Sequence, residues 1–152
     1  MSDVFLVADD ILKLSKKAGK ALTPLQLMKL TYIAHGFGLA LLNRDLIPER
    51  IEAWQYGPVI PDLYHVTKKF GRKPIPLSSI SDDDPKSSPE ALDLIEQVVD
   101  KYGSLSGYAL SQLTHKAGSP WHQVFEPDTF GIEIPDELIR EHYKAIVDAA
   151  KT

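Results

Sequence analysis

Five histidines have the clearest capacity for chemistry, because imidazole nitrogens bind metals and transfer protons near neutral pH. A zinc site built without cysteine requires closely spaced ligands, and this chain has no cysteine, no HxxxH pair and no HExxH motif. Two of the histidines flank a Gly-Ser-Pro turn, which leaves their relative positions open. We predict no metal site, and expect hydrogen-bonded or half-buried side chains at His35, His65, His115, His122 and His142.

Two polar pairs could support catalysis. Ser111 and His115 are four residues apart, a spacing that places them on one face of a helix. A serine nucleophile also needs an oxyanion site and an orienting acid, and no Gly-x-Ser-x-Gly motif is present. Glu49 and Glu52 lie in a polar connection, where we expect solvated carboxylates. No phosphate-binding glycine motif occurs either. We therefore predict no catalytic residue, no cofactor and a protein that is not an enzyme.

Two stretches combine tryptophan, glycine and proline. In the first, Pro58 restricts its own φ angle and that of Gly57, so the bend is fixed before any tertiary contact forms. The first stretch covers residues 53–64 and the second residues 113–121, and each forms a bend that we call a tryptophan corner. Two compatible interpretations apply to both. The tryptophans anchor loops on a core, or the two corners lie side by side and form a pocket or binding face. The candidate binding residues are Trp54, Tyr56, Gly57, Pro58, Val59, Asp62 and Tyr64 in the first stretch, with Thr114, His115 and Trp121 in the second.

A central helix over residues 24–42 is the main element expected to position these residues. Thr23, Pro24 and Gln26 form a capping box with proline at the first helical position. The helix is apolar on nearly all sides, which is typical of a buried helix. Gly36 and Gly38 weaken a helix interior, and we expect another backbone to approach closely there.

The remaining pattern predicts an all-α fold, with about six helices in a single compact domain over residues 1–152. Apolar spacing and capping residues favour helices over residues 3–18, 61–70, 89–102, 106–116 and from 135 onward, with a short turn at 119–125. A short extended segment is expected near residues 47–56. The proline- and serine-rich residues 73–88 predict a mobile loop.

Composition limits the possible partners. The chain has 152 residues and a net charge of −4, so it lacks the basic surface typical of nucleic-acid binding, and we expect none. An acidic domain favours a basic protein partner. No apolar run approaches the roughly 20 residues that span a bilayer, and the acidic N-terminal segment does not resemble a signal peptide. With no cysteine, the composition fits a reducing compartment, and we predict a cytoplasmic protein.

Three segments carry a family resemblance. Residues 51–64 read IEAWQYGPVIPDLY, residues 27–40 read LMKLTYIAHGFGLA, and residues 113–121 contain LTH followed by SPW. They resemble the signatures IEAWxYGPVxPxLY, LQKLLYYAQGWHLA and LTH…PW of the Panacea-domain antitoxin family, which includes SocA-like and uncharacterised phage-associated proteins. The similarity runs from about residue 4 to 148. This chain departs from the helix signature at Met28, Thr31, His35, Phe37 and Gly38.

The resemblance implies a helical antitoxin of a toxin–antitoxin system, which neutralises a cognate toxin by direct protein–protein binding. In the SocA-like case it also implies an alternative, a proteolytic adaptor that delivers the toxin to a Clp-type protease. A third alternative, drawn from the residues, is a small-ligand-binding or enzymatic domain that uses the corner from His115 to Trp121.

Overall fold

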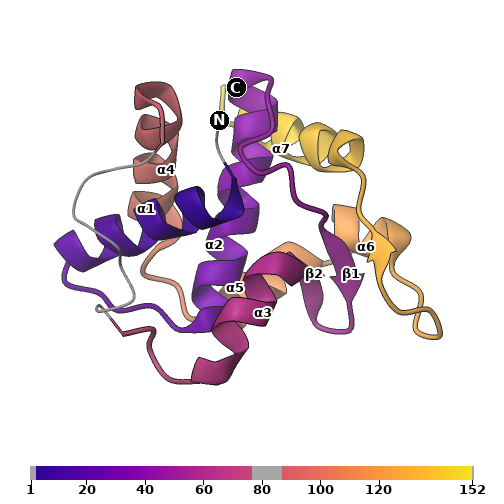
Figure 1. Ribbon diagram of the computed structural model, residues 1–152. Helices are drawn as coiled ribbons and strands as arrows, with labels where there is room; N and C mark the ends of the chain where they lie inside the picture. The colour runs from indigo at the N-terminus through magenta and orange to yellow at the C-terminus, as the bar shows by residue number, and fades with distance from the viewer. Residues whose placement is uncertain (1–2, 77–86, 152) are drawn as a thin grey trace.

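The computed structural model describes residues 3–76 and 87–151, and this part of the chain is mostly helical (Figure 1). The predicted all-α class is confirmed. The α-helices are α1 (Val4–Lys17), α2 (Pro24–Phe37), α3 (Pro61–Thr67), α4 (Pro89–Tyr102), α5 (Gly107–His115), α6 (Pro120–Val124) and α7 (Asp136–Ala150). The expected count of about six omitted α6, which is only five residues long and was assigned to a turn. Of the expected mobile loop, residues 77–86 lie outside the described residues.

Helix α2 is the centre of the fold, as the sequence predicts. It begins with the expected capping box, in which the Thr23 hydroxyl accepts from the Gln26 amide and the Gln26 side chain accepts from the Thr23 amide. Every residue from 27 to 39 is buried. Helices α1, α4, α5 and α7 all pack against it, and Figure 1 shows α2 standing upright in the middle of the molecule. After Phe37 the helix continues as a π-helical turn, η1 (Gly38–Leu42), and Asn43 ends it in the left-handed conformation.

The two glycines of the central helix face side chains rather than another backbone, so the expected backbone approach is wrong. The Tyr143 ring of α7 lies directly against Gly36, where it fills the space of a Cβ atom. At Gly38 an added Cβ would lie 2.7 Å from Leu46 Cγ. At both glycines a large side chain therefore packs directly against the helix backbone. The missing side chain at Gly36 allows α7 to pack closely on α2.

A small antiparallel sheet lies beside the helices. Strand β1 (Glu52–Trp54) lies between β2 (Gly57–Val59) and β3 (Ile132–Glu133). The extended segment near residues 47–56 is thus present in part, with a hairpin partner and a third strand that the sequence analysis did not identify. Pro58 is tolerated in β2 because β2 is an edge strand. Gly57 has a φ of 124°, a value that other residues rarely adopt.

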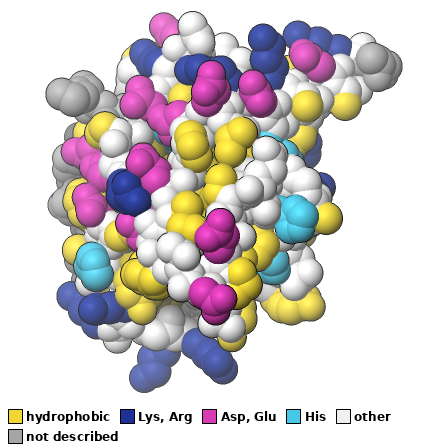
Figure 2. All heavy atoms as spheres, turned by 90° about the vertical axis from the view of Figure 1, so that its right-hand side faces the viewer, with side chains coloured by type: hydrophobic (Ala, Val, Ile, Leu, Met, Phe, Trp, Pro, Cys, Tyr) yellow, Lys and Arg dark blue, Asp and Glu magenta, His cyan; other side chains and the backbone are white. Residues whose placement is uncertain are grey.

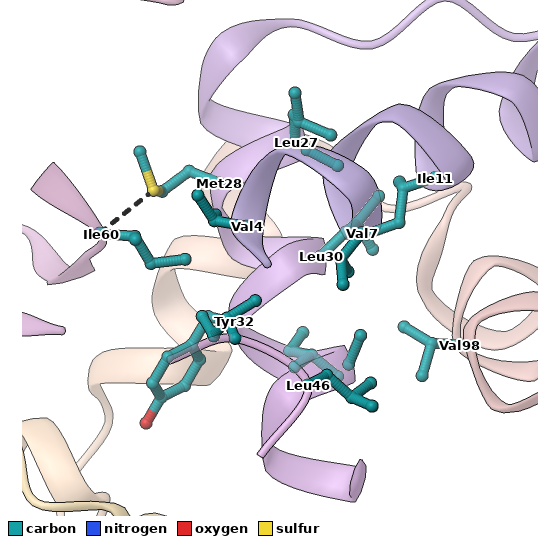
Figure 3. Close-up of a cluster of buried hydrophobic side chains, with 14 of the residues drawn as sticks. Val4, Val7, Ile11, Leu27, Met28, Leu30, Tyr32, Leu46, Ile60 and Val98 are labelled. Carbon is teal, nitrogen blue, oxygen red and sulfur yellow. Dashed lines mark hydrogen bonds between the residues drawn. The ribbon is translucent and has the colours of Figure 1, made fainter. Parts of the chain in front are cut away.

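A single apolar core joins α2 to its neighbours. Figure 3 shows Val4, Val7 and Ile11 of α1 facing Leu27 and Leu30 of α2. A methionine of the core also contacts the end of the hairpin. The Met28 Sδ atom accepts a hydrogen bond of 3.3 Å from the Ile60 amide. The start of α2 and the end of β2 are therefore joined.

A buried histidine joins the other end of α2 to α7. The His35 Nε2 atom lies 2.9 Å from an Asp136 carboxylate oxygen in the first turn of α7, and its Nδ1 atom faces the Ile47 amide at 3.5 Å. An acceptor at Nδ1 assigns the proton to Nε2, which then donates to Asp136. This contact adds a polar tie to the packing of Tyr143 on Gly36.

The helical stretch Pro24–Leu42 is long and apolar enough to cross a bilayer by length and composition, although the sequence analysis found no such run. In the fold, 72% of this stretch is buried by the surrounding protein. The burial accounts for its apolar character without a membrane.

Candidate functional site at the hairpin and the loop before β3

The two tryptophan corners meet in the structure. The Trp121 indole Nε1–H donates a hydrogen bond of 2.6 Å to the Trp54 carbonyl, and the Trp121 ring stacks on Phe125 with centroids 4.5 Å apart. Trp121 is only 8% exposed, so it serves as an anchor between the corners. Thr114 is also buried, and its hydroxyl donates to carbonyls of its own helix. Of the predicted site residues, these two and the hairpin residues Gly57 and Pro58 lie beneath the surface.

Ser111 and His115 lie on one face of α5 as expected, but their side chains do not hydrogen-bond to each other. The Ser111 hydroxyl donates a hydrogen bond of 2.9 Å to the Tyr56 carbonyl. The His115 Nδ1 atom instead faces the Ser111 carbonyl, and the His115 ring meets Trp121 edge-on. The pair therefore holds the hairpin against α5, and the geometry is not that of a serine activated by a histidine base.

Three predicted site residues face solvent. Tyr56, at the hairpin turn, is 72% exposed, Tyr64 in α3 is 37% exposed, and Asp62 is exposed. Trp54 is half-buried, and its indole ring contacts two aromatic rings. The Tyr64 ring centroid lies 5.0 Å from the Trp54 centroid, edge-on, and the Phe130 centroid lies 5.1 Å from it, tilted. Spacing alone predicted Trp54 and Tyr64, whereas Phe130 is brought in from the loop before β3.

These rings border a pocket of about 560 Å³, which we call the aromatic pocket. Its walls come from the first turns of α2, the β1–β2 hairpin, α3 and the loop before β3. The main apolar wall residues are Leu25, Met28, Trp54, Val59, Tyr64 and Phe130. The volume is typical of pockets that hold small organic ligands or the anchor side chains of a protein partner.

Lys29 also lines this pocket, although it is not among the residues predicted from the sequence. The residue is only 1% exposed, and its amine donates a hydrogen bond of 2.8 Å to the Pro58 carbonyl. Burial lowers the pKa of the Lys29 amine to about 7, because the low-dielectric surroundings disfavour the ammonium form. A single lysine inside the apolar run 27–34 is a sequence signal that could have identified it.

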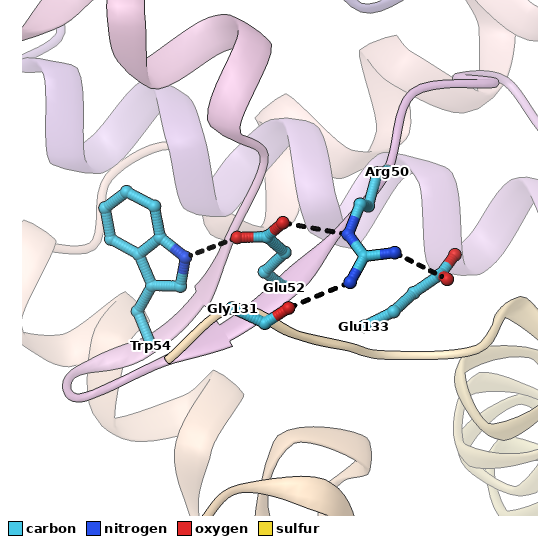
Figure 4. A network of polar contacts seen from close by, with 5 residues as sticks. All are labelled: Arg50, Glu52, Trp54, Gly131 and Glu133. Atoms are coloured by element: carbon cyan, nitrogen blue, oxygen red, sulfur yellow. Dashed lines mark hydrogen bonds and ion pairs between the residues drawn. The ribbon is translucent and has the colours of Figure 1, made fainter. Parts of the chain in front are cut away.

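A polar network fixes the orientation of Trp54. Figure 4 shows that the Trp54 indole Nε1–H donates to Glu52 at 2.9 Å, while the Arg50 guanidinium donates to Glu52, Glu133 and the Gly131 carbonyl. Glu52 is thus held between a cation and an indole, and it is neither solvated nor paired with Glu49. The Glu49 carboxylate instead accepts from the Val4 amide at the start of α1. The predicted role of these two glutamates is therefore wrong.

The histidines are spread over several elements. His35 and His122 are hydrogen-bonded, His122 by accepting from the Gly118 amide, while His65 lies exposed against Tyr64. Within residues 3–76 and 87–151, no three histidine, aspartate or glutamate side chains gather as a metal site would require.

The face that carries α6, α7 and the loop before β3 is mixed in character. Figure 2 shows a band of hydrophobic side chains on this face, with acidic side chains on and beside it. Phe130 is 79% exposed, the largest exposed fraction among the large hydrophobic residues of the described chain. Solvent-exposed rings beside a preformed pocket are typical of recognition surfaces.

Comparisons with known proteins agree on one relationship. A family model described as antitoxin SocA-like, Panacea domain, matches residues 27–122. Antitoxin SocA from Caulobacter vibrioides (strain NA1000 / CB15N) is 29% identical over 155 residues, an alignment that covers 93% of this chain and 82% of that protein. No solved structure matches the chain. The matched region contains α2 from Leu27 onward, the hairpin, α3, α4, α5 and most of the aromatic pocket.

Proposed function

The chain belongs to the antitoxin SocA-like, Panacea domain family, and on this premise we propose that it neutralises a cognate toxin by binding that toxin directly. The observation that supports the proposal most strongly is the aromatic pocket with its exposed border of Tyr56, Tyr64 and Phe130. Tyrosine and tryptophan provide large contact areas at low conformational cost, and such residues dominate binding energy at protein interfaces.

The hairpin is suited to this role because it is rigid before binding. Three side chains donate hydrogen bonds to hairpin carbonyls: Lys29 to Pro58, Ser111 to Tyr56 and Trp121 to Trp54. Three carbonyls of a short hairpin are thus held from three helices. A partner that binds Tyr56 therefore meets a side chain on a fixed backbone, which reduces the entropy lost on association.

Co-expression with the product of the adjacent gene tests the proposal. We expect the neighbour to arrest growth when expressed alone, and to be harmless when this chain is co-expressed and co-purifies with it. Alanine at Tyr56 or Tyr64 should weaken the complex by about 1–3 kcal/mol, roughly 5- to 150-fold in Kd, as measured by calorimetry.

Tyr108 provides the matched control. It is 73% exposed on α5, close to the value for Tyr56, and it is not among the residues that line the aromatic pocket. Tyr108→Ala should leave the affinity unchanged. A neighbour that is harmless alone, or a complex equally sensitive to all three substitutions, contradicts the proposal.

The same assay separates direct neutralisation from proteolytic delivery. If the protein acts by binding alone, the toxin remains at full level in co-expressing cells, with or without Clp proteases. A Clp-dependent fall in toxin level would instead identify an adaptor. Neutralisation by binding also predicts that both proteins are cytoplasmic, which fractionation of the co-expressing cells would check.

A further inference from the structure

The lining of the aromatic pocket has a charge opposite to that of the whole chain. The chain carries a net charge of −4, yet the described residues that line the pocket include two lysines and no aspartate or glutamate. Lys29 lies deep in the fold and Lys68 lies exposed on η2 (Lys68–Phe70). The other lining groups are mostly apolar. The pocket therefore combines an apolar interior with a basic character.

The Lys29 amine has capacity to bind a further group. An ammonium has three N–H donors, and in the described chain the only hydrogen-bond partner of this amine is the Pro58 carbonyl. Folding has already removed water from this amine, since the residue is 1% exposed without any ligand. An anion that reaches this amine would gain a charge-assisted hydrogen bond without the usual desolvation of the lysine.

The charged and titratable groups around Lys29 do not supply such an anion. From α5, His115 lies beside Gly57, the residue next to the Lys29 amine. From the hairpin and α3 come the phenol groups of Tyr56 and Tyr64, and from η2 comes the Lys68 side chain. The nearest carboxylate in the hairpin, Glu52, is already held by Arg50 and the Trp54 indole.

We propose that the aromatic pocket is a binding site for small monocarboxylates with an aromatic or aliphatic body. The carboxylate pairs with the Lys29 amine, and the apolar body lies among Met28, Trp54, Tyr64 and Phe130. The volume of about 560 Å³ holds a molecule of this size. The site differs in position from the corner of His115 and Trp121, since neither residue lines this pocket. The inference stands independently of toxin binding.

Two probe molecules that differ only at the charged group test the proposal: 4-phenylbutyrate and its neutral amide, 4-phenylbutanamide. In titrations followed by NMR on the ¹⁵N-labelled protein, both probes should shift the amides of Met28, Trp54 and Tyr64. The carboxylate should bind at least about tenfold more tightly than the amide at pH 6, because only the carboxylate forms a charge-assisted pair.

Proton uptake gives a second readout. The free Lys29 amine has a pKa of about 7, and a tenfold preference for the carboxylate raises it by about one pKa unit in the complex. Binding of the carboxylate at pH 8.5 should therefore take up at least about 0.2 proton, and binding at pH 6 less than about 0.1. Calorimetry in two buffers of different ionisation enthalpy measures this uptake. The affinity for 4-phenylbutyrate should accordingly fall as the pH rises above 7, while that for the amide stays constant.

Two substitutions separate the buried lysine from the exposed one. Lys29→Met should remove the preference for the carboxylate and the proton uptake, whereas Lys68→Met should keep the uptake and weaken binding by less than about threefold. If Lys29→Met does not fold, the two probes on the unsubstituted protein decide. Equal affinity for both probes, or no shift at the pocket amides, overturns the proposal. Overturning it leaves the toxin assay unaffected, so the two proposals fail separately.

Discussion

The Trp121 indole nitrogen lies 2.6 Å from the Trp54 carbonyl oxygen, a hydrogen bond between residues 67 positions apart in the chain. It joins the corner after α5 to the end of strand β1. Because Trp121 is buried and Trp54 lies at the border of the aromatic pocket, the bond links the helical core to the proposed binding surface.

Trp121→Phe should destabilise the protein by about 1–3 kcal/mol, because the Trp54 carbonyl loses its donor while the ring stacked on Phe125 is largely kept. Urea denaturation followed by circular dichroism measures the change. Trp54→Phe is the comparison variant, since it keeps the backbone carbonyl and the bond from Trp121 and loses only the part-buried indole bond to Glu52, so its loss of stability should be smaller. A loss for Trp54→Phe as large as that for Trp121→Phe would contradict the assigned role of this bond.

Lys29→Met should change how stability depends on pH. The amine has a pKa of about 7 in the fold and about 10.4 in the unfolded chain. Between these values the unfolded chain binds more protons, so the stability of the unsubstituted protein rises with pH, and the destabilisation by Lys29 is complete below pH 7. Relative to the variant, the unsubstituted protein should gain at most about 1.4 kcal/mol per pH unit from pH 7 to about 9.5.

Urea denaturation of both proteins at several pH values tests this dependence. Lys68→Met, on the exposed rim of the pocket, is the control, and its difference from the unsubstituted protein should stay flat over the same range. A flat difference for Lys29→Met as well would show that the amine is solvated in the folded protein.

Tyr32→Phe should leave the protein as stable or make it more stable, by up to about 1 kcal/mol. The Tyr32 hydroxyl is buried and has no hydrogen-bond partner among the described residues. Burying an unpaired hydroxyl destabilises the folded state, so its removal should not lower the free energy of unfolding. The same burial raises the pKa of this phenol far above its usual value. Thermal and urea denaturation measure the effect, with Tyr108→Phe on the surface as the neutral reference. A clear loss of stability would mean that the hydroxyl has a partner, such as a buried water.

Gly57→Ala should destabilise the hairpin by about 1–3 kcal/mol, through backbone strain at a φ of 124° and through crowding. An added Cβ would lie 2.9 Å from the Lys29 amine nitrogen. Gly118→Ala is the control for strain alone, because Gly118 has a φ of 87° with open space around its Cβ position. Equal losses for the two variants would show that the contact with Lys29 contributes nothing.

The sequence predicts the helices of this fold well, because their start and stop signals are local. The capping box of Thr23 and Gln26, and the serine caps at Ser88, Ser106 and Ser119, all form as local patterns require. Strand β3 was missed because two residues carry no periodic signal, and their pairing with β1 depends on the tertiary fold.

The candidate site was predicted only in part, for a similar reason. Trp54, Tyr56 and Tyr64 belong to one contiguous stretch, so the aromatic pattern identified them together. Phe130 reaches Trp54 only because β3 pairs with β1. Lys29 stands out in the sequence only as the single lysine of the apolar run 27–34. Its burial depends on how the hairpin lies over α2, which no local pattern predicts.

The packing of Tyr143 on Gly36 means that the core around α2 is completed only when the last helix is present. The ribosome synthesises the apolar helix α2 early, but α7, which covers one side of it, is made more than a hundred residues later. Until α7 emerges, the nascent chain exposes an apolar stripe that chaperones and proteases recognise. Chains that stop before α7 would therefore keep this side of α2 uncovered.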